Sequence, residues 1–156
     1  MAKYFDRILL LKNSTIFAEV AVEDLQVVAQ ALDTEFYVKG DRIIDINEQG
    51  DRMYMIHKGL IGISVHSDPE VKEFVATLGP GEFFGEMNLL DDLPRSATAH
   101  VIEDAELFSI ERGKLRNLII NYPELSFGML KSLSMRLRKT NKLLNQALDK
   151  EEEVES

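Results

Sequence analysis

The sequence of 156 residues predicts a mainly β fold with flanking helices, in which an antiparallel, jelly-roll-like β-roll lies between an N-terminal helical segment and a long C-terminal helix. Three observations support this prediction. Apolar residues recur at helical spacing near both ends of the chain, short segments of extended alternation fill the middle, and turns containing glycine separate those segments. The chain therefore divides into residues 1–34, 35–110 and 111–156.

The N-terminal part predicts helices over residues 3–12 and 22–32. In the second, acidic Glu23 and Asp24 fall in the first turn, where the helix dipole favours negative charge. Its apolar residues share one face: Leu25, Val28, Ala29 and Leu32. The chain is thus expected to begin as helices that bury one face.

The middle part is predicted to form strands over residues 35–46, 52–66, 71–83, 96–102 and 106–110. Turn residues occur at Lys39-Gly40, Lys58-Gly59 and Pro80-Gly81, at the spacing typical of a sandwich, roll or barrel. A compact all-β unit should therefore follow the helices.

The helical period returns over residues 113–122, is broken at Pro123, and resumes from 124 to about 150. Apolar residues of this last helix alternate in spacings of three and four, with Thr140 at the remaining seam position: Leu130, Leu133, Leu137, Leu144 and Ala147. This pattern predicts a parallel homodimer through a coiled coil. A monomer whose stripe folds back on the β-roll is the alternative. The charged tail, residues 149–156, is expected to fray.

Charge and composition exclude several classes of protein. Lys plus Arg is 18 and Asp plus Glu is 27, and the net charge of −9 argues against binding of nucleic acid or an anionic membrane by this chain alone. The absence of cysteine excludes disulfides and thiol nucleophiles, which makes the cytoplasm the expected compartment. The apolar run "ILLL" is far shorter than a bilayer span or a signal-peptide core.

The stretch "GEFFGEMNLLDDLPRSATA", residues 81–99, places one cation, Arg95, among four acidic side chains. Gly85 permits close backbone approach, the short helical turn after it offers free N–H groups, and the guanidinium fork of Arg95 can pair with two phosphate oxygens. Glu86 only accepts hydrogen bonds, so it suits a sugar hydroxyl and disfavours additional anions. The stretch can therefore wrap one phosphate.

Simpler interpretations of these residues exist. Arg95 could form a surface ion pair with Asp91 or Asp92, worth about 0–1 kcal/mol. Gly85 could be only a turn glycine, and Glu86 only a residue that the helix dipole favours. The arrangement of the whole segment favours the phosphate role.

This segment resembles the phosphate-binding cassette of the cyclic-nucleotide-binding domain family, which includes catabolite activators, regulatory subunits of cAMP-dependent kinases and cyclic-nucleotide-gated channels. The resemblance extends from about residue 12 to 148, with further support from "GDRMYMIHKGLIGI". It implies that Arg95 binds the cyclic phosphate, Glu86 accepts the ribose 2′-hydroxyl, and Ser96 contacts the phosphate or the base edge. The implied ligand-binding set here is Phe84, Gly85, Glu86, Met87, Arg95, Ser96 and Ala97.

The segment "MRLRKTN" in the last helix is similar to the part of catabolite activators in which a threonine and the next residue reach the base. The resemblance implies this role for Thr140 and Asn141, and Arg136 falls at a matching arginine. Thr140 could also fix the register of the coiled coil, and Asn141 could be merely solvated. The expected ligand is cAMP, with cGMP possible because a hydroxyl at Ser96 suits either nucleotide.

Two other classes of protein are alternatives to this interpretation. A cupin-like metal enzyme would need His57, His66 and His100 as ligands, but the sequence lacks a close His-x-His pair and any nucleophile-elbow or Walker pattern. A ligand-free interaction module is disfavoured by Glu86 and Arg95. We therefore expect a metal-free, non-enzymatic cytoplasmic sensor that couples nucleotide binding to movement of the helix after Tyr122-Pro123.

Overall fold

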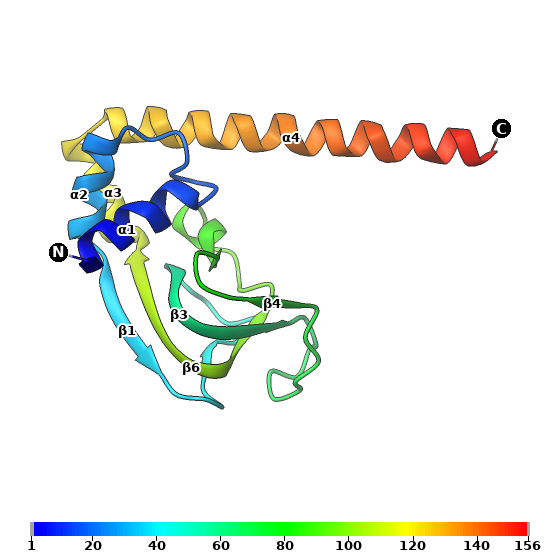
Figure 1. Ribbon diagram of the computed structural model, residues 1–156, viewed down its shortest axis with the longest axis horizontal. Coiled ribbons are helices and arrows are strands. Elements are labelled where there is room, and N and C mark those ends of the chain that lie inside the picture. The colour runs from blue at the N-terminus through cyan, green and yellow to red at the C-terminus, as the bar shows by residue number, and fades with distance from the viewer. Residues whose placement is uncertain (1, 156) are drawn as a thin grey trace.

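A computed structural model describes residues 2–155 (Figure 1). Helices α1 (Ala2–Asn13) and α2 (Val22–Gln30) precede an antiparallel sheet, and helices α3 (Arg112–Asn121) and α4 (Glu124–Glu155) follow it. The strands are β1 (Asp33–Tyr37), β2 (Arg42–Ile44), β3 (Arg52–Ser64), β4 (Ala76–Leu78), β5 (Phe83–Phe84) and β6 (Thr98–Glu111). A 3-10 helix, η1 (Glu86–Leu89), lies between β5 and β6. The predicted fold class is confirmed.

The long strands β3 and β6 form the centre of the sheet and curve together (Figure 1). Strands β1 and β2 pair with β6, whereas β4 and β5 pair with β3. The register of β3 with β6 shifts between Ile56 and Ile61. At the centre of this irregularity Gly59 has a φ of 105°, and a Cβ there would lie 2.6 Å from the carbonyl oxygen of Asp104. The bend of the central pair thus requires glycine at this position.

Three of the expected strands differ from those observed. Residues 96–102 and 106–110 were expected to be separate, but they belong to the continuous strand β6. Glu103 and Asp104 are exposed and have the polarity of a turn. The strand nevertheless continues through them, because the pairing of β3 with β6 is irregular at this point. The segment 71–83 contains only the short strands β4 and β5, because residues 71–75 and the Pro80-Gly81 turn leave the ladder.

Two apolar clusters stabilise the fold. The larger joins the helices to one end of the sheet and includes Leu11, Phe17, Leu25, Phe108 and Leu115. The smaller lies within the curve of the sheet and includes Tyr54, Ile61, Phe84, Val101 and Leu107. Because the smaller cluster includes Phe84 of β5, it holds in place the strand that directly precedes η1.

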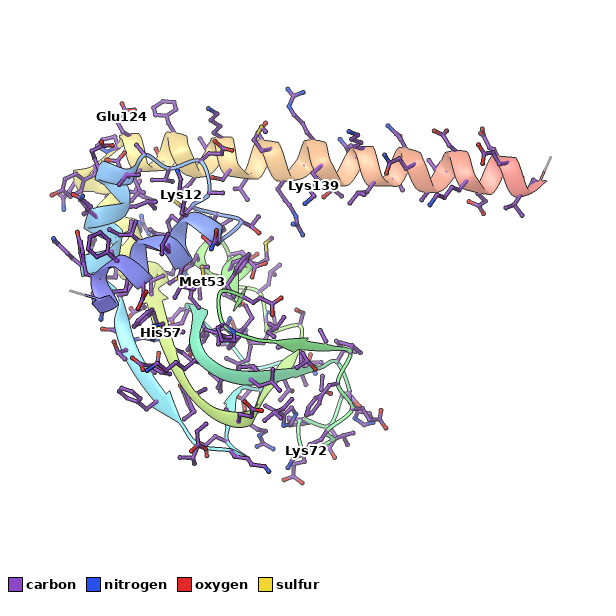
Figure 2. All side chains as sticks on the ribbon, in the orientation of Figure 1. Lys12, Met53, His57, Lys72, Glu124 and Lys139 are labelled. Carbon is purple, nitrogen blue, oxygen red and sulfur yellow. The ribbon has the colours of Figure 1, made fainter. Side chains whose placement is uncertain are left out.

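Helix α4 packs on the body only through its first turns. Leu125, Met129 and Ser132 are buried, and the Ser132 hydroxyl accepts a hydrogen bond from the Glu19 N–H at 2.9 Å and donates one to the Gly128 carbonyl at 2.9 Å. Beyond Leu133 every described residue of α4 is exposed, and the helix projects from the body (Figures 1 and 2).

Most of the predicted seam is therefore uncovered. Leu130, Leu137 and Leu144 are 62%, 61% and 56% exposed. Residues 149–155, expected to fray, continue the helix, since no glycine or proline follows Gly128 to end it. In the described part of the chain, no helix combines the length and the apolar character that a bilayer span requires.

The contact of α4 with the body predicts that Gly128→Ala destabilises the protein. A Cβ at Gly128 would lie 2.8 Å from Val20 Cγ2 and 2.9 Å from Val20 Cα, so the added methyl overpacks the joint. We expect a loss of about 1–3 kcal/mol in the free energy of unfolding, measured by urea denaturation. The matched control is Gly113→Ala in α3, where the Cβ would meet only the Glu111 side chain at 3.4 Å. An equal loss in both variants would contradict close packing at Gly128.

Candidate functional site

A pocket of about 340 Å³ is lined by η1, by the segment that precedes β6, and by residues of β2, β3, β4 and β5. Seven residues predicted to bind a ligand line it: Phe84, Gly85, Glu86, Met87, Arg95, Ser96 and Ala97. Its remaining wall is mainly apolar and includes Ile44, Ile63, Ala76 and Leu78. The structure therefore gathers the cassette residues around one cavity.

Arg95 is the central polar group of this pocket and is only 5% exposed. Its Nη1 donates to Asn88 Oδ1 at 2.9 Å, and its Nη2 donates to the carbonyl oxygen of Arg52 at 2.9 Å. Its backbone pairs with the preceding loop, through Glu48 and Asn47 at 2.8 Å each. Burial lowers the pKa of the Arg95 guanidinium from its ordinary value, although Tyr54 and Asp51 oppose this effect. The group stays charged near neutral pH, because arginine does not lose its proton in proteins.

The two acceptors of Arg95 are both neutral. Among residues 2–155, no carboxylate lies within ion-pair distance of its guanidinium. The nearby Asp91 instead accepts a hydrogen bond from the Leu93 N–H at 3.2 Å. The ion pair with Asp91 or Asp92 weighed from the sequence is therefore not formed. Two of the five N–H donors are bonded, and the others remain for an anion.

Two glycines leave room for the guanidinium. Gly85 has a φ of 78°, and a Cβ there would lie 2.7 Å from Arg95 Nη1 and 2.9 Å from the Arg52 carbonyl oxygen. A Cβ at Gly50 would lie 2.0 Å from Arg95 Nε. Gly85 is therefore more than a turn residue, because any side chain at either position would displace Arg95.

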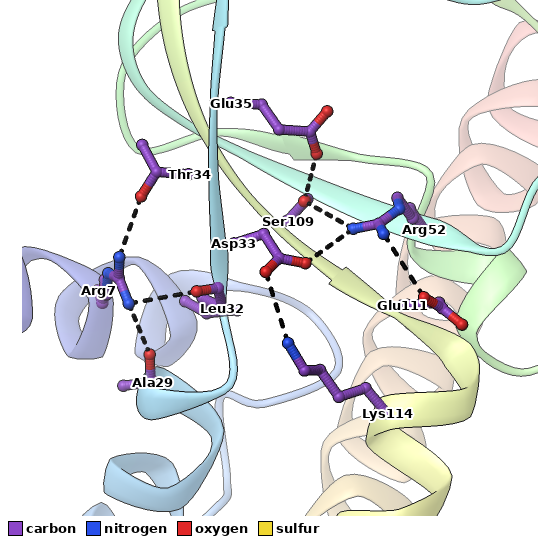
Figure 3. A network of polar contacts seen from close by, with 10 residues as sticks. All are labelled: Arg7, Ala29, Leu32, Asp33, Thr34, Glu35, Arg52, Ser109, Glu111 and Lys114. Atoms are coloured by element: carbon purple, nitrogen blue, oxygen red, sulfur yellow. Dashed lines mark hydrogen bonds and ion pairs between the residues drawn. The ribbon is translucent and has the colours of Figure 1, made fainter.

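The side chain of Arg52 lies in a polar network at one end of the sheet (Figure 3). The Arg52 side chain bonds Asp33 at 3.0 Å on β1, and Ser109 at 3.2 Å and Glu111 at 3.5 Å on β6. Lys114 of α3 contacts Asp33 at 3.5 Å. Arg52 lowers the pKa of Asp33, chiefly through their hydrogen bond. One residue of β3 thus links three strands and positions an acceptor for Arg95.

The pocket is also connected to the helices that follow the sheet. Arg112, the first residue of α3, donates through Nη1 to the carbonyl oxygen of Asn88 at 3.1 Å and to that of Asp91. Helix α3 ends before Tyr122, whose φ of −132° and ψ of 75° lie outside the helical region, and α4 begins after Pro123. A short path of contacts therefore joins η1 to the base of α4.

The other predicted ligand residues lie elsewhere. Arg136, Thr140 and Asn141 are exposed on the projecting part of α4 and do not line the pocket. Figure 2 shows side chains standing out on all sides of this part of the helix, as at Lys139. Their role in reading a base stays a prediction.

Sequence reasoning missed three contributors to the site: Gly50, the Arg52 carbonyl and Asn88. Gly50 and Arg52 belong to the segment quoted for the family resemblance, but no role was assigned to them. Asn88 is an amide between the apolar residues Met87 and Leu89, and it is only 7% exposed. A polar residue in an otherwise apolar turn is the signal that could have identified it.

The histidines of the cupin-like alternative do not gather. Within residues 2–155, no three His, Asp or Glu side chains are arranged to hold a metal ion. His57 contacts Asp6 at 3.0 Å, and His100 is buried with its ring 5.4 Å from that of Phe74. The absence of a bound metal nevertheless stays a prediction.

Comparison with known proteins identifies the family. The family model described as "Cyclic nucleotide-binding domain" matches residues 34–122, which is more than half of the chain. The chain therefore belongs to the cyclic nucleotide-binding domain family.

Three similar proteins illustrate its range. The CRP-like cAMP-activated global transcriptional regulator of Mycobacterium tuberculosis is 30% identical over 132 residues, covering 85% of this chain and 59% of that protein. The cGMP-dependent protein kinase, isozyme 2 forms cD5/T2, of Drosophila melanogaster is 31% identical over 144 residues, covering 90% of this chain and 15% of the kinase. The N-terminal domain of a transcriptional regulator from Streptomyces coelicolor has a TM-score of 0.77 at 27% identity, covering 86% and 93% of the two chains. This chain thus spans about three fifths of the M. tuberculosis regulator.

Proposed function

We propose that this chain is a cytoplasmic regulatory domain that binds cAMP in preference to cGMP and couples binding to the position of α4. The observation that carries the proposal is the buried Arg95, which faces a pocket in the family's cassette with neutral partners only. Anion binding would supply the charge partner that such a group lacks.

The pocket residues suit the parts of a cyclic nucleotide. The phosphate would pair with the free donors of Arg95, and Glu86 would accept the ribose 2′-hydroxyl. Ser96 would add a hydroxyl to the phosphate or the base edge. The apolar wall of Ile63 and Leu78 would cover the flat face of the purine. A volume of about 340 Å³ falls in the range of small-molecule sites.

The same residues favour binding over catalysis. Glu86 is the one carboxylate among the residues that line the pocket, and no histidine lies among them. Hydrolysis of a phosphate ester ordinarily needs an activated water, supplied by a positioned base or a metal ion. We therefore propose that the domain binds the nucleotide without cleaving it.

The coupling would run from η1 through Arg112 to α3 and then to α4. A ligand shifts such an arrangement only by its different affinity for the two positions of the helix. The bonds from Arg112 to the carbonyls of Asn88 and Asp91 support this path, because they tie α3 to the turn that would hold the phosphate. The matched region spans 59% of the similar regulator and 15% of the similar kinase.

The experiment that tests the proposal is calorimetric titration with cAMP and cGMP. We expect Arg95→Lys to weaken both nucleotides by about 1.5–3 kcal/mol, the usual worth of a hydrogen bond to a charged group, because lysine keeps the charge but loses the planar fork. Arg95→Ala should weaken them further. Unchanged affinity in Arg95→Ala would rule out the phosphate role.

A third titration, with 2′-deoxy-cAMP, separates the two polar contacts. This analogue keeps the phosphate and lacks the hydroxyl that Glu86 would accept. Equal binding of cAMP and its deoxy analogue by the native chain would remove the Glu86 role while leaving that of Arg95 intact.

We assign the preference for cAMP to Thr140 and Asn141. These side chains would reach the base only if α4 closed over the pocket, either in the same chain or from a second subunit. The Asn141 amide can accept a hydrogen bond from the adenine amino group, whereas guanine presents a carbonyl there. We expect Thr140→Ala plus Asn141→Ala to weaken cAMP by about 1–3 kcal/mol and to narrow its advantage over cGMP in the same titrations. Equal weakening of both nucleotides would shift base recognition to Ser96.

The exposed seam supports a parallel homodimer through Leu130, Leu137 and Leu144. Sedimentation at micromolar concentration should give a dimer, and Leu137→Glu should convert it to the monomer of 17.7 kDa. Met135→Glu is the control, because Met135 is 50% exposed and lies off the seam. A native monomer with and without nucleotide would refute the dimer.

A further inference from the structure

We propose that Asn88 positions Arg95 for its anionic ligand, and that an amide rather than a carboxylate is required there because it orients the guanidinium without forming an ion pair with it. The inference rests on the proposed function. It adds one residue to the site and states that the acceptor at this position must be neutral for Arg95 to bind an anion. It concerns a side chain in the pocket wall to which the sequence analysis gave no role.

The geometry of Asn88 fixes which way its amide faces. Its Nδ2 donates to the Leu93 carbonyl oxygen at 2.8 Å, so Oδ1 is directed to Arg95 Nη1 at 2.9 Å. The opposite orientation would set N–H groups against N–H groups and two carbonyl oxygens against each other. The backbone N–H of Asn88 donates to Gly85 at 3.2 Å, and its carbonyl accepts from Arg112. Every polar group of this buried residue is therefore engaged.

The chemistry of the acceptor matters because the guanidinium is buried. An amide oxygen and a backbone carbonyl orient the N–H groups of Arg95 but carry no net charge. A carboxylate in the same place would form a desolvated ion pair, which is strong at low effective dielectric. An incoming phosphate would then meet a neutral pair instead of a cation. The nearby Asp91 accepts a hydrogen bond from the Leu93 N–H and does not occupy this position.

Asn88→Asp and Asn88→Ala test the inference, because we expect opposite orders of the two variants in stability and in nucleotide affinity. Aspartate keeps an oxygen for Arg95 and adds the ion pair, which should outweigh the lost bond from Nδ2 to the Leu93 carbonyl, so its melting temperature should stay nearer the native value than that of the alanine variant. Its affinity should nevertheless be the lowest, at least about tenfold below native for both cAMP and cGMP. Alanine removes the tether but leaves the charge free, so we expect lower stability and an intermediate affinity.

The order of the two variants in melting temperature should thus be the reverse of their order in affinity. This reversal distinguishes positioning from a structural role, because loss of a merely structural residue would lower affinity in proportion to stability. Thermal melting and calorimetry on the same samples of the full chain measure both quantities. Asn117→Asp is the matched control, because it makes the same change in charge at an exposed site on α3. It should bind both nucleotides as the native chain does.

Four results would overturn the inference: native affinity in Asn88→Asp, an affinity of Asn88→Asp above that of Asn88→Ala, an Asn88→Asp chain that does not fold, or an equal loss in Asn117→Asp. The last would show a general effect of added negative charge. If the native chain binds neither nucleotide, the proposed function fails, and this inference with it. If the native chain binds and Asn88→Asp binds equally well, only the role of Asn88 is removed.

Discussion

A buried guanidinium that meets only neutral acceptors is the constraint around which the pocket is built. Burying a charge without an opposite charge is costly, so the surrounding structure must hold Arg95 firmly for it to remain inside. Gly50 and Gly85 leave the space, the Arg52 carbonyl and the Asn88 amide supply the bonds, and loop residue Glu48 pairs with its backbone. Hydrogen bonds and ion pairs of the Arg52 side chain join β3 to β1 and β6, and so support the strand that supplies one of these acceptors (Figure 3).

The second organising feature is the continuity between the cassette and the helices. Arg112 is both the first residue of α3 and a donor to two carbonyls of the segment around η1. Helix α3 leads into the non-helical Tyr122, and α4 is seated on the body at Gly128 and Ser132. The pocket and the projecting helix are thus separated by one short helix and one bend. The larger apolar cluster packs the N-terminal helices against the sheet and forms the rigid body relative to which they could move.

The sequence predicted well those features that depend on residues close together in the chain. The fold class, the break at Pro123 and the pocket residues from Phe84 to Ala97 follow from local periodicity and from one contiguous motif. Strand β6 was wrongly divided, because Glu103 and Asp104 have the composition of a turn and only pairing with β3 reveals the bulge. Gly50, just before β3, meets Arg95, just before β6, a contact that neither residue's neighbours in sequence could indicate.

The seat of α4 at Gly128 and Ser132 has a mechanical consequence. The exposed part of the helix beyond Leu133 is roughly 33 Å long at 1.5 Å per residue, and it is stiffened by its own backbone hydrogen bonds. A rotation of about 10° at the seat would carry its far end through roughly 6 Å, by simple leverage over that length. Under such a rotation the helix would act as a lever arm, because a point far from the seat moves in proportion to its distance from it.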